Sequence, residues 1–247
     1  DTYTFTNGYF YFLKSFLFKI SILLSNCKIA YINKTAALSY LKNINSEKIY
    51  LPNIYINANK NLLDKKKSVC RNNNSIIIAL TGTSSPKKNH QKFLNHSLAK
   101  NNNISFILYG EDNKYTSYLI KRFYHLKLKF IDSNTQTLDE LFTHVDLLLI
   151  QNQDEGFCRP ILSALSNNKL VLAPDSQIYR EFYHQVPLYY SCQMELTKYL
   201  NEIISVPSCY NLFVSKRSRR LSNVINEINS NSKLALSIFS NMLTTEN

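Results

Sequence analysis

The chain has 247 residues, enough for one complete domain and part of a second, but too few for a complete large enzyme. Its 45% apolar residues are typical of a globular protein. The 29 Lys and Arg residues exceed the 17 Asp and Glu residues and give a formal net charge of +12. That charge favours a phosphorylated ligand, an anionic lipid or a nucleic acid as partner, without choosing among them.

The five cysteines are scattered and form no C-x-x-C pair, so the sequence indicates neither a disulfide framework nor a zinc site. The five histidines have no metal-ligand spacing either. We therefore expect no metal ion, no cofactor, and a location in the reducing cytoplasm.

The first predicted element is a helix at Tyr9 to Ser25, where apolar residues recur at helical spacing. Its most apolar part, Tyr9 to Leu24, is interrupted by Lys14 and Lys19 and is shorter than the roughly 20 apolar residues of a membrane span. The pattern fits a core helix or, because of the lysines, a helix lying in a membrane interface. The chain opens with Asp1 rather than Met, which fits either a longer gene product or processing.

Two short strands are predicted next, at Lys28 to Ile32 and Lys48 to Leu51, with a short helix opened by Thr35 between them. Polar and basic residues then replace the apolar pattern over residues 61–75, which predicts a linker.

Beyond the linker, short apolar runs alternate with helical patterns, which is typical of βαβ units. Strands are predicted at Ser75 to Leu80, Ile104 to Tyr109, Leu126 to Ile131, Asp146 to Ile150, Leu170 to Ala173 and Leu188 to Tyr190. Helices are predicted at Lys88 to Lys100, Lys114 to His125, Leu138 to Val145, Pro160 to Asn167, Ile178 to Tyr183, Met194 to Ser205 and Lys216 to Leu243. Thr137 and Glu140 have the spacing of a capping box. The fold class is therefore α/β, a Rossmann-like and mostly parallel sheet with helices on both faces.

Three of the four glycines follow predicted strands: Gly82, Gly110 and Gly156. In an open parallel sheet, ligands bind at the carboxyl ends of the strands. Ordinary turn chemistry explains any one of these glycines as well, but it explains the three together less easily.

The segment from Gln151 to Ser176 combines an acidic-Gly turn, a helix that begins near Pro160 and a second apolar strand. The backbone N–H groups near Cys158 to Ile161 should be unpaired and point outward, because the first turn of a helix has no intrahelical acceptors for them. Such N–H groups bind anions, so this segment predicts a phosphate site.

These motifs resemble the group 1 (family 4) glycosyltransferases. The run ALTGTSSPKKNHQKFL supplies Gly82, Thr83 and Lys88 where the family has a Gly-Arg...Lys loop, and LYGEDNKY supplies Gly110 at the next turn. The family's two signature glutamates, which have seven residues between them, correspond to Glu155 and Ser163. The resemblance covers residues 76–206 and implies the C-terminal half of a GT-B fold, which consists of two facing Rossmann-like domains.

The resemblance also implies a domain organisation. Residues 1–60 would be a remnant of the N-terminal Rossmann-like domain, residues 61–75 the linker, residues 76–206 the nucleotide-sugar-binding domain and residues 207–247 the C-terminal helices. The implied function is a retaining glycosyltransferase, or its donor-binding half, that transfers a hexose from a UDP- or GDP-linked sugar to a glycan or lipid-linked glycan at a bacterial cell surface.

By resemblance, Glu155 is the catalytic residue, because it would bond hydroxyls of the donor sugar on the face where the anomeric centre reacts. Lys88 would contact phosphate, and Gly156 with the N–H groups of Phe157, Cys158 and Arg159 would hold phosphate or sugar oxygens. A solvated loop acid at Glu155 and a surface lysine at Lys88 are the plainer alternatives.

The chain departs from the family at two donor-binding positions. Ser163 stands where a glutamate grips the ribose hydroxyls, and Thr83 stands where an arginine binds diphosphate, with Arg159 as a candidate source of the missing charge. Cys158 lies near a helix start, which could lower its thiol pKa. The two substitutions leave open an alternative function, a degenerate, non-catalytic binding or scaffold protein.

The excess of basic over acidic residues suggests further partners. One candidate is an anionic membrane surface, to which this protein would bind peripherally at the inner face of the membrane. Nucleic acid is not expected, because the basic run Lys216 to Arg220 has no recognition motif beside it.

Overall fold

The computed structural model describes residues 29–34, 41, 48–52, 75–82, 85–153 and 155–244. They fall into two compact units, each described by itself below. The first unit comprises Asp1–Ile56, Asp154–Phe157 and Asn226–Asn247, and the second comprises Asn57–Gln153 and Cys158–Ile225. The predicted helix at Tyr9 to Ser25 and residues 61–74 of the predicted linker lie outside the described residues, and the three boundaries between the four predicted segments stay predictions.

The first unit contains a pair of parallel strands, β1 (Ile29–Tyr31) and β2 (Lys48–Tyr50). Ala30 pairs with Ile49, and the rings of Tyr31 and Tyr50 at the strand ends lie 5.4 Å apart. Both strands lie where the sequence predicts them.

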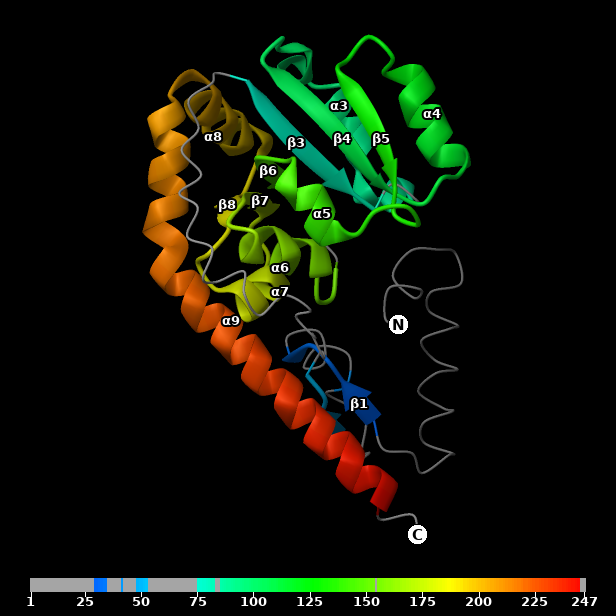
Figure 1. Cartoon of the computed structure of the whole chain (residues 1–247), viewed down its shortest axis with the longest axis vertical. Coiled ribbons are helices and arrows are strands. Elements are labelled where there is room, and N and C mark those ends of the chain that lie inside the picture. Colours follow the sequence, from blue (N-terminus) through cyan, green and yellow to red (C-terminus); the bar gives the residue numbers. More distant parts are fainter. Residues whose placement is uncertain are drawn as a thin grey trace. The chain divides into compact units, whose positions relative to one another are not determined.

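The second unit is built on a six-stranded sheet in the order β5-β4-β3-β6-β7-β8, in which every pair is parallel (Figure 1). The strands are β3 (Ile76–Thr81), β4 (Ile104–Gly110), β5 (Leu128–Asp132), β6 (Leu147–Leu149), β7 (Leu170–Pro174) and β8 (Leu188–Tyr190). The order reverses at β3, between β4 and β6. This arrangement confirms the α/β, Rossmann-like fold class, and the reversal marks the point where such sheets bind ligands.

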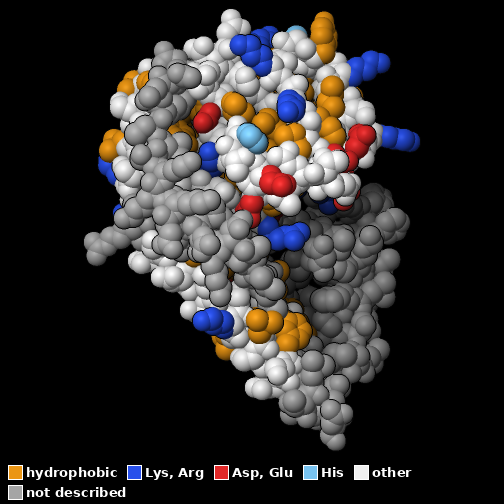
Figure 2. All heavy atoms as spheres, in the orientation of Figure 1, with side chains coloured by type: hydrophobic (Ala, Val, Ile, Leu, Met, Phe, Trp, Pro, Cys, Tyr) orange, Lys and Arg blue, Asp and Glu red, His pale blue; other side chains and the backbone are white. Residues whose placement is uncertain are grey.

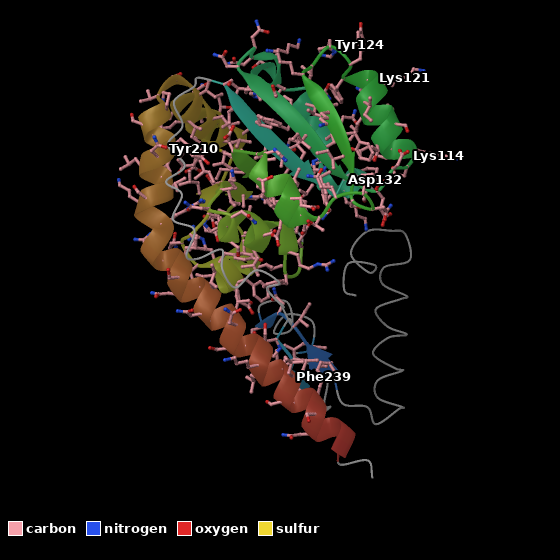
Figure 3. All side chains as sticks on the ribbon, viewed as in Figure 1. Lys114, Lys121, Tyr124, Asp132, Tyr210 and Phe239 are labelled. Carbon is pink, nitrogen blue, oxygen red and sulfur yellow. The ribbon has the colours of Figure 1, made fainter. Side chains whose placement is uncertain are left out.

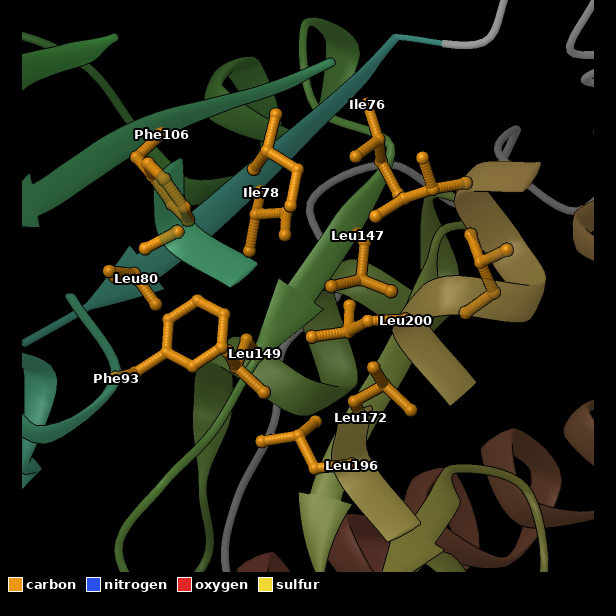
Figure 4. Close-up of a cluster of buried hydrophobic side chains, with 14 of the residues drawn as sticks. Ile76, Ile78, Leu80, Phe93, Phe106, Leu147, Leu149, Leu172, Leu196 and Leu200 are labelled. Carbon is orange, nitrogen blue, oxygen red and sulfur yellow. The ribbon is translucent and has the colours of Figure 1, made fainter. Parts of the chain in front are cut away.

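The strands pack a hydrophobic core on one face of the sheet because their alternate residues share that face. Ile76, Ile78 and Leu80 of β3 belong to this core, with residues of α3 (His90–Leu94), α4 (Lys114–Arg122) and α8 (Gln193–Ser205). Figure 4 shows the leucines of β6, β7 and α8 in this core, together with Phe93 and Phe106. The other face is covered by α5 (Leu138–Thr143), α6 (Arg159–Ser166) and α7 (Gln177–Tyr183).

Local sequence sets the helix starts. At α5, the hydroxyl of Thr137 accepts the Glu140 N–H and the Glu140 carboxylate accepts the Thr137 N–H, so the predicted capping box is confirmed. The side chains of Asn113 and Ser176 likewise accept N–H groups from the first turns of α4 and α7.

The single helix expected from Lys88 to Lys100 is wrong. The structure has three short pieces there: η3 (Pro86–Lys88), α3, and η4 (Ser97–Lys100). Asn89 adopts a left-handed conformation with φ 57°, and His96 is extended, so each interrupts the helix. Asparagine tolerates the left-handed region better than most residues, which makes Asn89 a suitable break.

The chain ends in a long helix, α9 (Pro207–Thr244), which starts nine residues before the predicted position because Pro207 suits the first turn of a helix. Tyr210, labelled in Figure 3, is fully buried and donates its hydroxyl to the Asp146 carbonyl beside β6. Within the described residues, no helix is both long and apolar enough to cross a membrane.

Candidate functional site

The candidate residues of the second unit lie at the carboxyl edge of its sheet. Gly82 follows β3, Gly110 is the last residue of β4, and Arg159 begins α6 after β6. In Figure 3, Asp132 at the end of β5 marks this edge, whereas Tyr124 marks the opposite one. The carboxyl edge is where ligands bind in sheets of this kind.

Gly82 and Lys88 are in close contact. Gly82 has φ 78°, a left-handed conformation that L side chains rarely adopt, and its N–H donates to the Tyr109 carbonyl at 2.8 Å. A Cβ atom added at Gly82 would lie 2.8 Å from Cε of Lys88. The aliphatic part of Lys88 therefore packs over the backbone of the turn after β3.

The loop from Ser85 to Asn89 positions Lys88. The Ser85 hydroxyl accepts the Lys87 N–H at 3.3 Å, and the Ser85 carbonyl accepts the Lys88 N–H at 3.1 Å. Burial lowers the pKa of Lys88, while the nearby Cys158 thiol acts in the opposite direction. A partly desolvated ammonium group is a stronger attractor of anions than a fully hydrated one.

His90 lies beneath the same turn. It is 2% exposed, and its Nε2 donates to the Thr81 carbonyl at 3.1 Å, while its buried Nδ1 has no hydrogen-bond partner. Burial is the main cause that lowers the pKa of His90 from 6.5 to about 4. The ring is therefore neutral at pH 7, and its role is to support the strand end rather than to supply charge.

A methyl group at Gly82 should disturb Lys88. We expect Gly82→Ala to weaken binding of a nucleoside diphosphate about tenfold, because the new Cβ meets Lys88 and forces alanine into a left-handed conformation. Calorimetric titration with UDP or GDP measures the loss. Tyr124→Ala is the control, since Tyr124 is 83% exposed and lies at the opposite edge of the sheet; an equal loss in both variants would contradict a specific contact at Gly82.

Cys158 caps the start of α6 without a side-chain hydrogen bond and is 3% exposed. Burial raises the pKa of its thiol to about 11, although the Lys88 ammonium acts in the opposite direction. The lowered thiol pKa considered from the helix position is therefore wrong, because desolvation outweighs the helix start.

The first turn of α6 offers fewer N–H groups than expected. The Ile161 N–H donates to the Cys158 carbonyl at 3.0 Å, and Pro160 has no N–H. The expectation that Ile161 would be unpaired is therefore wrong. Among the described residues, the N–H groups of Cys158 and Arg159 have no acceptor, and the Arg159 side chain is exposed.

Three tyrosine hydroxyls fix the loop between β6 and α6. Tyr190 donates to the Ile150 carbonyl at 2.6 Å, Tyr179 to the Asn152 carbonyl at 2.8 Å, and Tyr183 to the Cys158 carbonyl at 2.8 Å. Sequence reasoning missed these residues. The available signal was the four-residue spacing of Tyr179 and Tyr183, which places both rings on one face of α7.

Removing one of these hydroxyls should cost stability. We expect Tyr183→Phe to lower the free energy of unfolding by about 1 kcal/mol, because the Cys158 carbonyl loses one of its two donors and keeps the Ile161 N–H. Urea unfolding at pH 7 measures the change. Tyr124→Phe removes a hydroxyl from a residue that is 83% exposed and should leave stability unchanged; equal curves for the two variants would contradict the role of the hydrogen bond.

Ser163 lies in the second turn of α6, 3% exposed. Its hydroxyl donates to Oδ1 of Asp139 on α5, and Nδ2 of Asn167 donates to the same oxygen at 3.0 Å. The serine in the signature position is thus bonded to a carboxylate from the neighbouring helix.

The sequence pattern of the family described as glycosyl transferases group 1 matches residues 63–186, half of the chain. The chain belongs to the glycosyl transferases group 1.

Solved structures have the same fold as this group 1 glycosyltransferase. HepE from Anabaena, in complex with UDP-glucose, is 17% identical with a TM-score of 0.65, covering 90% of this chain and 68% of that one. A variant of S. aureus TarM, in complex with fondaparinux, alpha-GlcNAc-glycerol and UDP, is 16% identical with a TM-score of 0.64, covering 87% and 43%. Sucrose-phosphate synthase from Thermosynechococcus elongatus is 12% identical with a TM-score of 0.64, covering 95% and 62%. No curated protein matches the chain in sequence.

Not all predicted site residues of the group 1 glycosyltransferase lie in the second unit. Glu155, Gly156 and Phe157 belong to the first unit, where a Cβ added at Gly156 would lie 3.7 Å from Cδ1 of Ile32. Thr83 lies outside the described residues. The roles expected of these four residues stay predictions.

A hollow of about 600 Å³ lies away from the candidate site, over the middle of β4 and β5. Its lining includes Ser105, Ile107 and Lys129 from these strands and His144 from the end of α5, and none of the candidate residues. In the part of the group 1 glycosyltransferase that the structure describes, no three His, Cys, Asp or Glu side chains lie close enough together to hold a metal ion.

Proposed function

We propose that the chain is a retaining glycosyltransferase, or its donor-binding half, that transfers a hexose from a UDP- or GDP-linked sugar to a cell-surface glycan. Its membership of the glycosyl transferases group 1 supports glycosyl transfer. The observation that carries donor binding is the packing of Lys88 over the Gly82 turn, at the carboxyl edge of a parallel sheet.

The chemistry of the transfer explains why a cation is needed there. When the bond between the anomeric carbon and the diphosphate breaks, negative charge builds up on the departing oxygen. In this proposal the Lys88 ammonium and the N–H groups of Cys158 and Arg159 stabilise that charge, since helix N-termini favour anions. Glu155 acts on the donor sugar, and the Arg159 side chain supplies the charge that Thr83 lacks.

The acceptor and the location are part of the same proposal. TarM was solved with UDP and two carbohydrate ligands, which supports a glycan or lipid-linked glycan as acceptor. A lipid-linked acceptor would place the protein at the inner face of a membrane. On the face shown in Figure 2, basic side chains are interspersed with acidic ones, so the part of the chain described there gives no support to a large nucleic-acid surface.

Calorimetry and donor turnover test this proposal together. We expect the protein to bind UDP or GDP, and the corresponding UDP-glucose or GDP-mannose, at micromolar to millimolar concentrations. We expect Glu155→Gln to abolish release of sugar from the donor while the nucleoside diphosphate still binds. Proton NMR of the transferred sugar reports whether its anomeric configuration is retained. An Arg159→Ala protein with unchanged affinity would remove Arg159 from the proposal.

A non-catalytic binding or scaffold protein is the second candidate. It is favoured by the serine at position 163, whose hydroxyl is already bonded to Asp139. A protein that binds none of the four nucleotides, and whose Glu155→Gln variant behaves as the wild type does, would support this candidate and contradict the first.

A further inference from the structure

The hydrogen bond of Ser163 brings an unexpected carboxylate to the candidate site. Asp139 is the second residue of α5, and its side chain is partly exposed. Its Oδ1 atom accepts hydrogen bonds from the Ser163 hydroxyl and from Nδ2 of Asn167. Two donors, one in α6 and one at its C-cap, therefore hold one oxygen of the carboxylate, and Oδ2 has no partner among the described residues.

The segment before α5 is fixed to the carboxyl edge of the sheet. The Tyr109 hydroxyl near the end of β4 donates to the Gln136 carbonyl at 2.7 Å, and the Thr135 and Gln136 N–H groups bond the Asp132 carbonyl at the end of β5. The capping box then sets the first turn of α5. Asp139 is thus positioned by β4, β5 and α6.

The spacing along α6 relates Asp139 to the diphosphate. Ser163 lies four residues beyond Arg159, which corresponds to about 6 Å along a helix axis. A nucleoside diphosphate whose phosphates sit at the start of α6 would have its ribose about one helical turn away. The two ribose hydroxyls are hydrogen-bond donors, and a carboxylate oxygen is the strongest acceptor available among protein side chains.

We propose that Asp139 binds the ribose hydroxyls of the donor nucleotide, with Ser163 and Asn167 as residues that position its carboxylate. The proposal rests on the function proposed above and assigns its ribose contact to α5. The serine at position 163 then does not remove the carboxylate from the site, because Asp139 supplies one from the adjacent helix and the serine orients it.

Matched ribose and deoxyribose nucleotides test this assignment. UDP, or GDP if that is the one bound, is titrated against its 2′-deoxy counterpart in the wild-type protein and in Asp139→Asn. We expect the wild type to prefer the ribose form about tenfold, since a hydrogen bond to a charged group is lost with the 2′-hydroxyl. In Asp139→Asn the preference should fall close to one, with little change for the deoxy form. Ser163→Ala should lose part of the preference.

Glu140→Gln is the matched control, because it removes the neighbouring charge and keeps the capping box, which accepts Gln as well as Glu. It should retain the tenfold preference. A wild-type protein that binds the ribose and deoxyribose forms equally, or an Asp139→Asn protein that keeps the preference, would overturn the assignment while leaving donor binding intact. A wild type that binds neither form would overturn the proposed function as well.

Discussion

Lys88→Ala should weaken binding of a nucleoside diphosphate about 10- to 100-fold. The estimate corresponds to the loss of one charged hydrogen bond to phosphate in a partly buried site. Lys88 packs over the Gly82 turn and belongs to a loop fixed by Ser85, so its side chain loses little freedom when it binds the anion. Calorimetric titration with the diphosphate and with the corresponding nucleoside separates the phosphate contribution, since nucleoside affinity should stay the same.

Lys87→Ala provides the comparison for this result. Lys87 is exposed and immediately precedes Lys88 in η3, so its removal changes net charge equally without touching the Gly82 turn. We expect its effect to be less than threefold and to vanish in 0.5 M salt, because exposed charges are screened. Equal losses in the two variants would mean that the diphosphate responds to the overall charge of the protein and not to a site at Lys88.

The free energy of unfolding should fall as the pH drops from 6.5 towards 4, because of His90. Its pKa is about 4 in the folded protein and 6.5 as an ordinary histidine. Above pH 6.5 the ring is neutral in both the folded and the unfolded state, so His90 does not lower the free energy of unfolding. Below pH 6.5, His90 is protonated in the unfolded chain but not in the folded protein. The resulting decrease in the free energy of unfolding reaches about 3 kcal/mol near pH 4.

Carboxylates also titrate below pH 5, so the effect of His90 must be isolated by substitution. In His90→Gln, which can still donate to the Thr81 carbonyl, urea unfolding between pH 7 and 4.5 should show a clearly shallower decline than in the wild type. His125→Gln changes an exposed histidine and should follow the wild-type curve. Parallel curves for all three proteins would show that the folded protein accepts the proton at His90.

Local patterns in the sequence predicted the sheet well. The strand that became β3 is a run of apolar residues between polar ones, and such a run has few alternatives to a buried parallel strand. The capping box at Thr137 could be predicted because both of its partners, Thr137 and Glu140, lie within one helical turn. The helix after Lys88 was wrong because a single backbone angle at Asn89 decides it, and apolar spacing does not report that angle.

The site could be predicted only in part because its decisive contacts join residues distant in sequence. Ser163 and Asp139 are separated by 24 positions, and Tyr183 and Cys158 by 25. Nothing in the local sequence indicates either pair. The thiol pKa of Cys158 was misjudged for a related reason: the helix start is visible in the sequence, whereas the burial that raises the pKa depends on the packing of the whole sheet.

The tyrosines that hold the loop between β6 and α6 also make it optically observable. The chain contains no tryptophan, so its 17 tyrosines are the intrinsic fluorophores, with no energy transfer to a stronger emitter. Tyr179, Tyr183 and Tyr190 donate to the carbonyls of Asn152, Cys158 and Ile150, so any shift of these carbonyls would change those hydrogen bonds. The difference in emission between the wild type and a Tyr→Phe variant thus follows the loop without an added label.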